Sequence, residues 1–281
     1  MINLNGHLFS ENEVSISPNN RGLLFGDAVF ETLKISSGKI LFWEDHYFRL
    51  MASMRIMRME IPMNFTLEYL KGQILKTVTE NFADVSAVRA RLTIFRNEGG
   101  LYTPTELSVS FLITVSLLES PFYLVNNGNY EVELFKDHYI NSGLLSTIKT
   151  NNKAIHILGG IYARENGYQN CLLLNEQKMI VEALNGNLFL VFGKTIKTPP
   201  ITDGCLRGVF RKQLIDLIKQ LSEYTLVEET ISPFELQKAD ELFITNVISG
   251  IQPVTKYRKK IYANDVAKDL INKLNVKIRL S

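Results

Sequence analysis

Cysteine is scarce in this chain, which has Cys171 and Cys205 among its 281 residues. So few thiols give no basis for a disulfide framework, and Cys171, within an apolar run, is expected to be a buried core thiol. The longest apolar stretch, residues 109–118, is too short and too interrupted to span a bilayer. The N-terminal residues have neither the basic nor the apolar region of a signal peptide. We therefore expect a cytoplasmic protein.

An excess of either charge is also absent, since 31 Lys and Arg stand against 29 Asp and Glu, for a net charge of +2. The basic residues are scattered, so no nucleic-acid surface is indicated. The one dense run, residues 256–260, follows a proline, and we expect a solvated loop or strand end there. With 46% hydrophobic and 21% charged residues, the composition indicates a folded globular protein.

Several catalytic patterns are missing. The histidines are His7, His46, His138 and His156; no pair has metal-ligand spacing and no cysteine lies near them, so no metal site is expected. The chain has no Gly-x-Gly-x-x-Gly, no Gly-Lys-Ser/Thr and no Gly-x-Ser-x-Gly pattern. The sequence therefore gives no support to a Rossmann, P-loop or serine-hydrolase interpretation.

Strand-like and helix-like segments are mixed without regular βαβ alternation, which favours two α+β domains. The pattern breaks between residues 119 and 129, at a proline, three Asn and a Gly. We expect a small N-terminal domain at 1–119, a linker at 120–129 and a larger domain at 130–281. Helices are predicted at 44–59, 66–81, 151–166, 205–224 and 266–274. Strands are predicted at 28–35, 39–42, 88–95, 107–117, 130–135, 170–174, 179–181, 188–192 and 242–245.

A series of short motifs follows in one order along the chain. They are Arg21-Gly22-Leu23-Leu24-Phe25-Gly26-Asp27, His46-Tyr47-Phe48-Arg49-Leu50, Ile148-Lys149-Thr150-Asn151-Asn152, Glu182-Ala183-Leu184-Asn185-Gly186-Asn187, Thr198-Pro199-Pro200, Leu206-Arg207-Gly208-Val209-Phe210-Arg211, Ala239-Asp240-Glu241 and Gln252-Pro253-Val254. Each motif alone is weak. Together, over nearly the whole chain, they resemble the class IV aminotransferases and 4-amino-4-deoxychorismate lyases, the fold-type IV pyridoxal-phosphate (PLP) enzymes.

The resemblance implies a fold like that of D-amino-acid aminotransferase, with a small α+β N-terminal domain and a larger, β-rich cofactor domain. It implies PLP as the cofactor, a small amino substrate and a homodimer whose active site lies between the domains. Lys149 matches the lysine that carries PLP as an imine and then acts as a base. Residue type alone would indicate that Lys149 is a surface lysine at a loop–helix junction. Lys153, one helical turn away, is the alternative candidate for the lysine that carries PLP.

Glu182 matches the carboxylate that keeps the pyridine nitrogen protonated, so that the ring withdraws electrons. The alternative is a glutamate facing solvent at a strand end. For the phosphate, the resemblance assigns Arg49, whose alternative is a helix arginine paired with a carboxylate. The remaining cofactor-binding residues are Asn187, the start of a helix at Gly208, Val209 and Phe210, and the turn at Asn246 and Val247.

Two departures bear on the reaction. Phe210 and Val247 stand where many transaminases of this family have threonine. The lyase branch often lacks these two threonines as well. The loop from Arg96 to Tyr102 resembles a lyase loop, imperfectly, and Arg96 and Tyr102 are candidate substrate contacts. Phe30, a third candidate, replaces a tyrosine of the D-amino-acid transaminases, which argues against that activity.

Three functions remain open at this point. A 4-amino-4-deoxychorismate lyase, forming 4-aminobenzoate and pyruvate for folate synthesis, leads narrowly over a branched-chain or related aminotransferase. A D-amino-acid transaminase or a non-catalytic PLP-binding relative comes behind both. The trap for a substrate carboxylate cannot be placed from the sequence.

Overall fold

The computed structural model describes residues 1–126 and 128–280, which divide into two compact units. Unit 1 comprises Met1–Phe122 together with Ile148–Asn152, and unit 2 comprises Tyr123–Thr147 and Lys153–Ser281. The predicted ranges 1–119 and 130–281 place residues 148–152 in the second domain, whereas their contacts place them in unit 1. The predicted linker, 120–129, includes residue 127, which lies outside the described residues.

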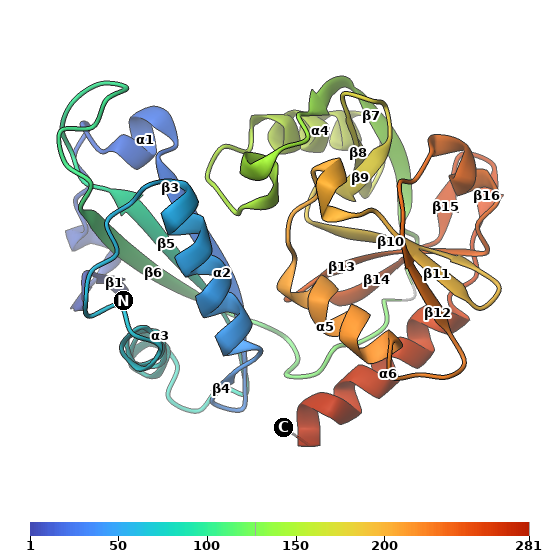
Figure 1. Cartoon of the computed structure of the whole chain (residues 1–281). Coiled ribbons are helices and arrows are strands. Elements are labelled where there is room, and N and C mark those ends of the chain that lie inside the picture. The colour runs from blue at the N-terminus through green and yellow to red at the C-terminus, as the bar shows by residue number, and fades with distance from the viewer. Residues whose placement is uncertain (127, 281) are drawn as a thin grey trace. The chain divides into compact units, whose positions relative to one another are not determined.

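Unit 1 is an antiparallel sheet with strand order β2-β1-β6-β5-β3-β4, covered on one face by helices α2 and α3 (Figure 1). Strands β3 and β5 pair over their whole length, from Ala28 opposite Phe95 to Ser36 opposite Ala87. The elements are β1 (Ile2–Leu4), β2 (His7–Phe9), η1 (Glu11–Glu13), α1 (Arg21–Phe25), β3 (Ala28–Ser36), β4 (Lys39–Ile40), α2 (Trp43–Ile56), α3 (Leu67–Asn81), β5 (Ala87–Arg96) and β6 (Val109–Leu117).

The helices of unit 1 follow from local sequence signals. Glu44 and Asp45 lie in the first turn of α2, where the helix dipole favours negative charge. The side chain of Thr66 accepts a hydrogen bond from the Tyr69 amide and so caps α3. Leu50 and Met54, which are fully buried, place α2 against the apolar face of the sheet. The opposite face of the sheet remains available for polar side chains.

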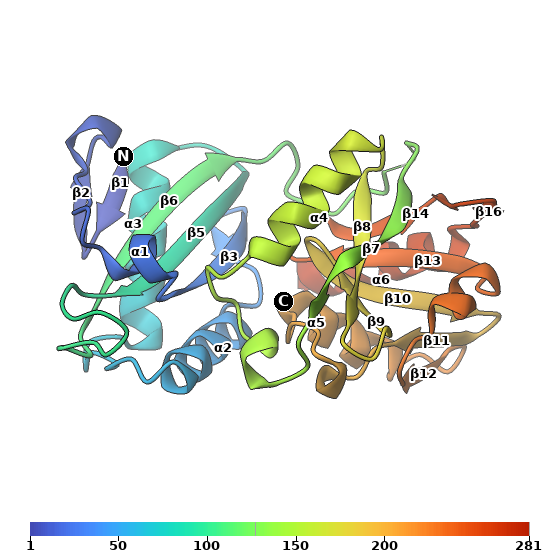
Figure 2. The ribbon, with the colours of Figure 1, turned by 90° about the horizontal axis from the view of Figure 1, so that it is seen from above.

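Unit 2 is a mixed sheet with strand order β12-β11-β10-β9-β8-β7-β15-β16, to which β13 and β14 are added through β10. Helix α4 lies beside β7 and β8 (Figure 2), and α5 and α6 contact β13. The elements are β7 (Glu131–Ile140), η2 (Leu144–Thr147), α4 (Ala154–Glu165), β8 (Asn170–Asn175), β9 (Ile180–Ala183), β10 (Gly186–Phe192), β11 (Thr195–Thr198), η3 (Ile201–Asp203), α5 (Val209–Ile218), β12 (Thr225–Glu228), η4 (Pro233–Gln237), β13 (Glu241–Asn246), β14 (Gly250–Val254), β15 (Lys256–Tyr257), β16 (Lys260–Ile261) and α6 (Asp265–Leu280).

Several predicted helix boundaries are wrong. Helix α2 ends at Ile56 instead of residue 59, and helix α5 ends at Ile218 instead of residue 224. Helix α4 begins at Ala154 instead of residue 151, because Asn151 hydrogen-bonds to strand β3. Helix α5 begins at Val209 instead of residue 205, because the Leu206 amide is bound to a side chain of β9. Helix α6 extends to Leu280, beyond the predicted residue 274.

Cys171 is buried, as predicted, and the basic run lies at strand ends, as predicted. Cys171 and Cys205 are buried and free, and burial raises the pKa of each thiol to about 12. The run at 256–260 forms β15, a turn and β16, with Lys256 paired to Glu131 and Arg258 paired to Glu133. No helix within residues 1–126 and 128–280 has the length and apolar character needed to cross a membrane.

Candidate active site

The segment that carries Lys149 is held as an extra strand on the edge of β3. The Phe30 amide donates to the Lys149 carbonyl at 2.8 Å, and the Asn151 amide donates to the Ala28 carbonyl at 3.0 Å. Between these bonds, Val29 and Thr150 form an antiparallel bridge. Lys149 is therefore half-buried and fixed by sheet bonding, unlike a surface lysine at a loop–helix junction.

Two cations share the aromatic ring of Phe30. The Lys149 Nζ lies 4.6 Å from the ring centroid, and the Arg91 guanidinium carbon lies 3.8 Å from it. Arg91 is held in place by its Nη2, which donates to Asn151 Oδ1 at 3.0 Å, and by its Nε, which donates to Thr93 Oγ1 at 3.1 Å. Burial lowers the pKa of Arg91, and the neighbouring Arg89 lowers it further. The pair forms a local positive site suited to an anion.

Arg91 is a residue that the sequence reasoning missed. Its signal lies in the alternation of β5, where Val88, Ala90 and Leu92 are buried on the helix-covered face and Arg91 points the other way. Local alternation alone does not predict that Arg91 lies over the same ring as Lys149. That arrangement depends on the pairing of β3 with both β5 and the 148–152 segment.

Beside the site, a buried triad joins β3 to α2. His46 Nδ1 lies 2.6 Å from Glu31 Oε2, and Arg49 Nε donates to Glu31 Oε1 at 2.8 Å. Burial alone would raise the pKa of Glu31, but Arg49 and His46 outweigh it and lower that pKa to about 2. Burial lowers the pKa of His46, whose Nε2 has no hydrogen-bond partner within the part of the chain described.

Arg49 is thus paired with a carboxylate, as the alternative interpretation of this residue proposes. The pair fixes the orientation of its guanidinium, because both Nε and Nη2 bind the two oxygens of Glu31. The role of Arg49 at a phosphate stays a prediction.

Glu182 lies on β9, buried among the apolar residues of unit 2, with a side chain that is 7% exposed. The solvent-facing alternative for Glu182 is therefore wrong. Its Oε1 lies 3.1 Å from His156 Nε2, and its Oε2 accepts the Leu206 amide at 2.9 Å. The carboxylate is thus held from two sides by hydrogen-bond donors, and His156 is a second residue that the sequence reasoning missed.

The start of α5 provides a close approach to the backbone. Gly208 is the N-cap residue, and a Cβ added there would lie 2.0 Å from Asn187 Oδ1. Asn187 is itself fixed, because its Nδ2 donates to the Leu206 carbonyl at 2.9 Å. The first amides of a helix have no partner inside the helix, so the backbone at Val209 and Phe210 is suited to a phosphate group.

The second predicted phosphate cradle, at Asn246 and Val247, is a tight turn between β13 and β14. Asn246 Oδ1 accepts the amides of Ile248 at 3.0 Å and Ser249 at 2.8 Å. The hydroxyl of the buried Tyr123 donates to the Val247 carbonyl at 2.7 Å. The side chain of Asn246 thus serves the turn itself, and the cofactor contacts of Asn246 and Val247 stay predictions.

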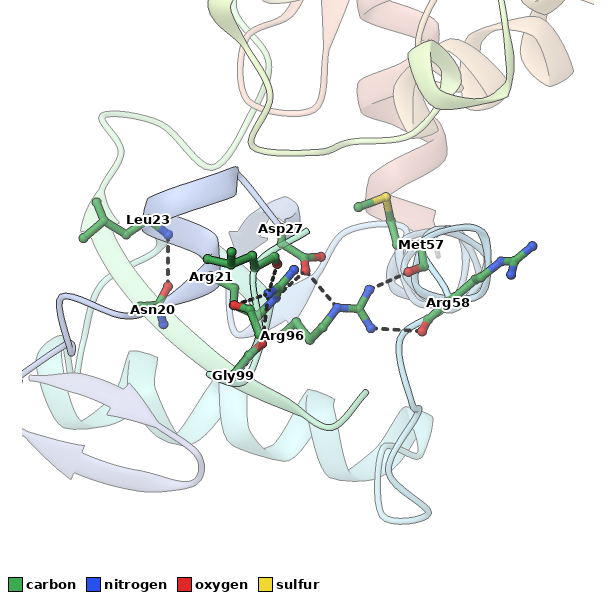
Figure 3. Close-up of polar contacts among 10 residues, drawn as sticks. Asn20, Arg21, Leu23, Asp27, Met57, Arg58, Arg96 and Gly99 are labelled. Atoms are coloured by element: carbon green, nitrogen blue, oxygen red, sulfur yellow. Dashed lines mark hydrogen bonds and ion pairs between the residues drawn. The ribbon is translucent and has the colours of Figure 1, made fainter. Parts of the chain in front are cut away.

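Arg96, at the end of β5, joins neighbouring segments of unit 1 through hydrogen bonds (Figure 3). The side chain is buried; its Nε donates to Asp27 Oδ2 at 2.8 Å, its Nη1 to the Arg58 carbonyl at 3.0 Å and its Nη2 to the Met57 carbonyl at 2.6 Å. Asp27 also accepts Arg21 Nε at 3.0 Å. These partners engage each nitrogen of the Arg96 guanidinium, so its position gives no support to a direct substrate contact.

The loop after Arg96 is tied down by Arg21, whose Nη1 donates to the Leu101 carbonyl at 2.6 Å. Tyr102, by contrast, is 90% exposed, and its ring lies 5.8 Å from that of Phe25. A substrate contact of Tyr102 stays a prediction. Within residues 1–126 and 128–280, no group of three His, Cys, Asp or Glu side chains is placed to hold a metal ion.

Comparison with known proteins identifies the family. The model of the family "Amino-transferase class IV" matches residues 28–257. A Methanocaldococcus jannaschii protein described as "Putative branched-chain-amino-acid aminotransferase" is 28% identical over 279 residues, which cover 99% of this chain and 95% of that protein.

Solved structures show the same fold. The branched-chain aminotransferase of the archaeon Thermoproteus uzoniensis, solved with norvaline, superposes with a TM-score of 0.85 at 22% identity, covering 96% of this chain and 92% of its own. The 4-amino-4-deoxychorismate lyase of Pseudomonas aeruginosa gives a TM-score of 0.82 at 22% identity, covering 99% of each chain. The predicted fold-type IV architecture is confirmed.

Proposed function

Since this chain belongs to the class IV aminotransferase family and is therefore a PLP-dependent aminotransferase or lyase, we propose that it transfers amino groups from branched-chain or related amino acids. The observation that carries the proposal is the pair of cations, Lys149 and Arg91, on the ring of Phe30. An aminotransferase needs a reactive amine close to a group that binds the substrate carboxylate. The full-length similarity to the M. jannaschii protein supports the same choice.

The residues present fit the cofactor. We assign Lys149 as its covalent attachment point and Glu182 as the carboxylate for its ring nitrogen, because Glu182 is buried and its two oxygens contact His156 and the Leu206 amide. We assign the start of α5 to the phosphate, because the N-cap residue Gly208 makes no side-chain cap and the first amides of the helix have no partner inside it. When bound, PLP supplies an electron sink for the bond broken next to the substrate amine.

The chain's own residues then do the remaining work. Arg91, held by Thr93 and Asn151, binds the substrate carboxylate and so orients the amine-bearing carbon toward Lys149. Lys149 Nζ takes the proton from that carbon of the amino donor and gives a proton to the matching carbon of the 2-oxo acid acceptor. The buried ring of Phe30 provides an apolar contact for both cations.

A 4-amino-4-deoxychorismate lyase is the second candidate. The side chains of Phe210 and Val247 have no hydroxyl, as in much of the lyase branch, and both residues contact Tyr123. The similarity of Arg96 to the lyase loop adds less, because this residue is buried in the Asp27 network. In the lyase reaction Lys149 would take the proton from the ring carbon that bears the amine, and loss of pyruvate would form the aromatic product.

One experiment separates the two activities. PLP-loaded protein is incubated with L-leucine, L-glutamate or D-alanine and a 2-oxo acid, and separately with 4-amino-4-deoxychorismate. Amino exchange with the L-amino acids supports the proposal, whereas 4-aminobenzoate and pyruvate together overturn it in favour of the lyase. Lys149→Ala should abolish either activity and Lys153→Ala, the matched control, should keep it. If wild-type protein binds PLP but forms no product in either assay, both candidate functions are refuted.

We further propose a homodimer in the cytoplasm. In unit 1, helix α1 and the loop bound by Arg21 carry exposed apolar side chains, with Leu23 68%, Leu24 53%, Leu101 77% and Tyr102 90% exposed. Such a group is typical of a protein–protein contact. Sedimentation of wild type at twice the chain mass, and of Leu101→Asp at the chain mass, is expected. A wild-type monomer at all concentrations would refute the dimer.

A further inference from the structure

His156 binds the carboxylate that we assign to the cofactor's ring nitrogen. It lies in the first turn of α4, with a side chain that is 15% exposed, and its Nε2 is 3.1 Å from Glu182 Oε1. A carboxylate can only accept hydrogen bonds, so an ionised Glu182 requires a proton on this imidazole nitrogen. The geometry therefore makes His156 a donor to Glu182.

The hydrogen bond from His156 matters because Glu182 lies among buried apolar residues. Ile180, Val181 and Ala183, its neighbours on β9, are each at most 1% exposed. A buried carboxylate without hydrogen-bond donors becomes protonated more readily, because burial disfavours its charge. Glu182 accepts from His156 at Oε1 and from the Leu206 amide at Oε2.

The two donors also fix the direction of the carboxylate. The Leu206 amide is set by the backbone that leads into α5, and His156 is set by α4, so the carboxylate plane is held between two elements. The donor at Oε2 is a backbone amide, whereas the donor at Oε1 is the His156 side chain. Replacement of His156 therefore removes only the hydrogen bond to Oε1.

We propose that His156 is a positioning residue that holds the Glu182 carboxylate by a hydrogen bond at Oε1 so that its other lone pairs serve the ring nitrogen of PLP. This inference rests on the proposed role of Glu182. It predicts that loss of the imidazole weakens the preference of the protein for a cofactor that has a ring nitrogen. It does not predict any loss of the contacts made by Lys149 or by the start of α5.

The test uses two cofactors and three variants of the full chain. Equilibrium binding is measured for PLP and for 1-deaza-PLP, in which a C–H replaces the ring nitrogen. His156→Leu fills the space of the imidazole without a donor, His156→Gln keeps an N–H at a similar reach, and Glu182→Gln removes the charge. The visible absorbance of the bound cofactor is titrated with pH as a second readout, and far-UV circular dichroism verifies folding.

Wild type should prefer PLP over 1-deaza-PLP, and Glu182→Gln should lose most of that preference. His156→Leu should reduce the preference about tenfold, the value of a hydrogen bond to a charged group, and His156→Gln should stay within about threefold of wild type. The pH midpoint of the visible band should move in His156→Leu and return in His156→Gln.

Failure of this inference is distinguishable from failure of the proposed function. If wild type does not bind PLP, or if Glu182→Gln keeps the full preference, the assigned role of Glu182 is wrong. If Glu182→Gln loses the preference while His156→Leu keeps it, Glu182 acts without His156 and the inference alone is overturned. Equal losses in His156→Leu and His156→Gln would also overturn it.

Discussion

Replacement of Glu31 by glutamine should be among the most destabilising single changes in unit 1. The carboxylate is 1% exposed and accepts hydrogen bonds from His46 and Arg49. Glutamine has the same shape but has one acceptor oxygen, and its amide would face donors. The change therefore leaves the Arg49 guanidinium, 11% exposed, without its counter-charge.

The magnitude follows in two ways. Removal of one partner of a buried ion pair costs about 3–5 kcal/mol. Independently, the pKa of Glu31 falls from its ordinary 4.5 to about 2 in the folded chain, which corresponds to about 3 kcal/mol of stability at neutral pH. We expect Glu31→Gln to lower the free energy of unfolding of unit 1 by about 3 kcal/mol at pH 7.

The effect should depend on pH with a definite sign. Because the pKa of Glu31 is lower in the folded than in the unfolded chain, the unfolded chain binds the extra proton on acidification. The stabilisation by Glu31 is complete above pH 4.5 and is lost as the pH falls toward about 2. The difference between wild type and Glu31→Gln should shrink over that range.

Fluorescence provides the assay, because Trp43 is the single tryptophan of the sequence and begins the helix that carries His46 and Arg49. Urea unfolding is followed at several pH values, with Glu80→Gln on α3 as the exposed control, expected to change stability by less than about 0.5 kcal/mol. A Glu31→Gln effect as small as that of the control, or one independent of pH down to about pH 3, would refute the assignment of a buried charged triad.

Further predictions concern other parts of the chain. Gly208→Ala should weaken PLP binding at least about tenfold in equilibrium dialysis, because a Cβ there meets a buried amide oxygen at 2.0 Å, whereas Gly160→Ala, with open space around it, should not. Arg96→Gln should lower the urea-unfolding free energy by about 3 kcal/mol, because it removes the buried guanidinium that pairs with Asp27 and donates to two carbonyls; an unchanged midpoint would contradict this. Cys171 and Cys205, whose pKa values burial raises to about 12, should resist alkylation at about pH 8 until the chain is unfolded, as mass spectrometry can verify.

Much of the fold can be predicted from local pattern. The strands at 88–95 and 188–192 and the helices at 44–59 and 66–81 are found within a few residues of their predicted ends. These segments carry their own periodicity of apolar residues, which decides both the type of element and the face that is buried. The ends of α4 and α5 are predicted less well, because contacts with β3 and β9 compete there with helix formation.

Some residues of the candidate site can be predicted from the sequence, and others cannot. Motif order along the chain identifies the family and the candidates Lys149 and Glu182, since these depend on residue type and spacing. The sequence does not distinguish an arginine that contacts substrate from one that holds a loop. Arg96 is committed to Asp27 and to two carbonyls, while Arg91 lies on Phe30.

The sequence by itself therefore determined the family, the cofactor chemistry and the longer helices and strands, but not the short strands such as β1, β2 and β12. Only the tertiary structure decided that Lys149 joins the edge of β3, that Arg91 shares the ring of Phe30 with it, and that His156 binds Glu182. These contacts join residues that lie up to about 120 positions apart along the chain. Strand register and helix packing bring such residues together, and neither is encoded in the local period of apolar and polar residues.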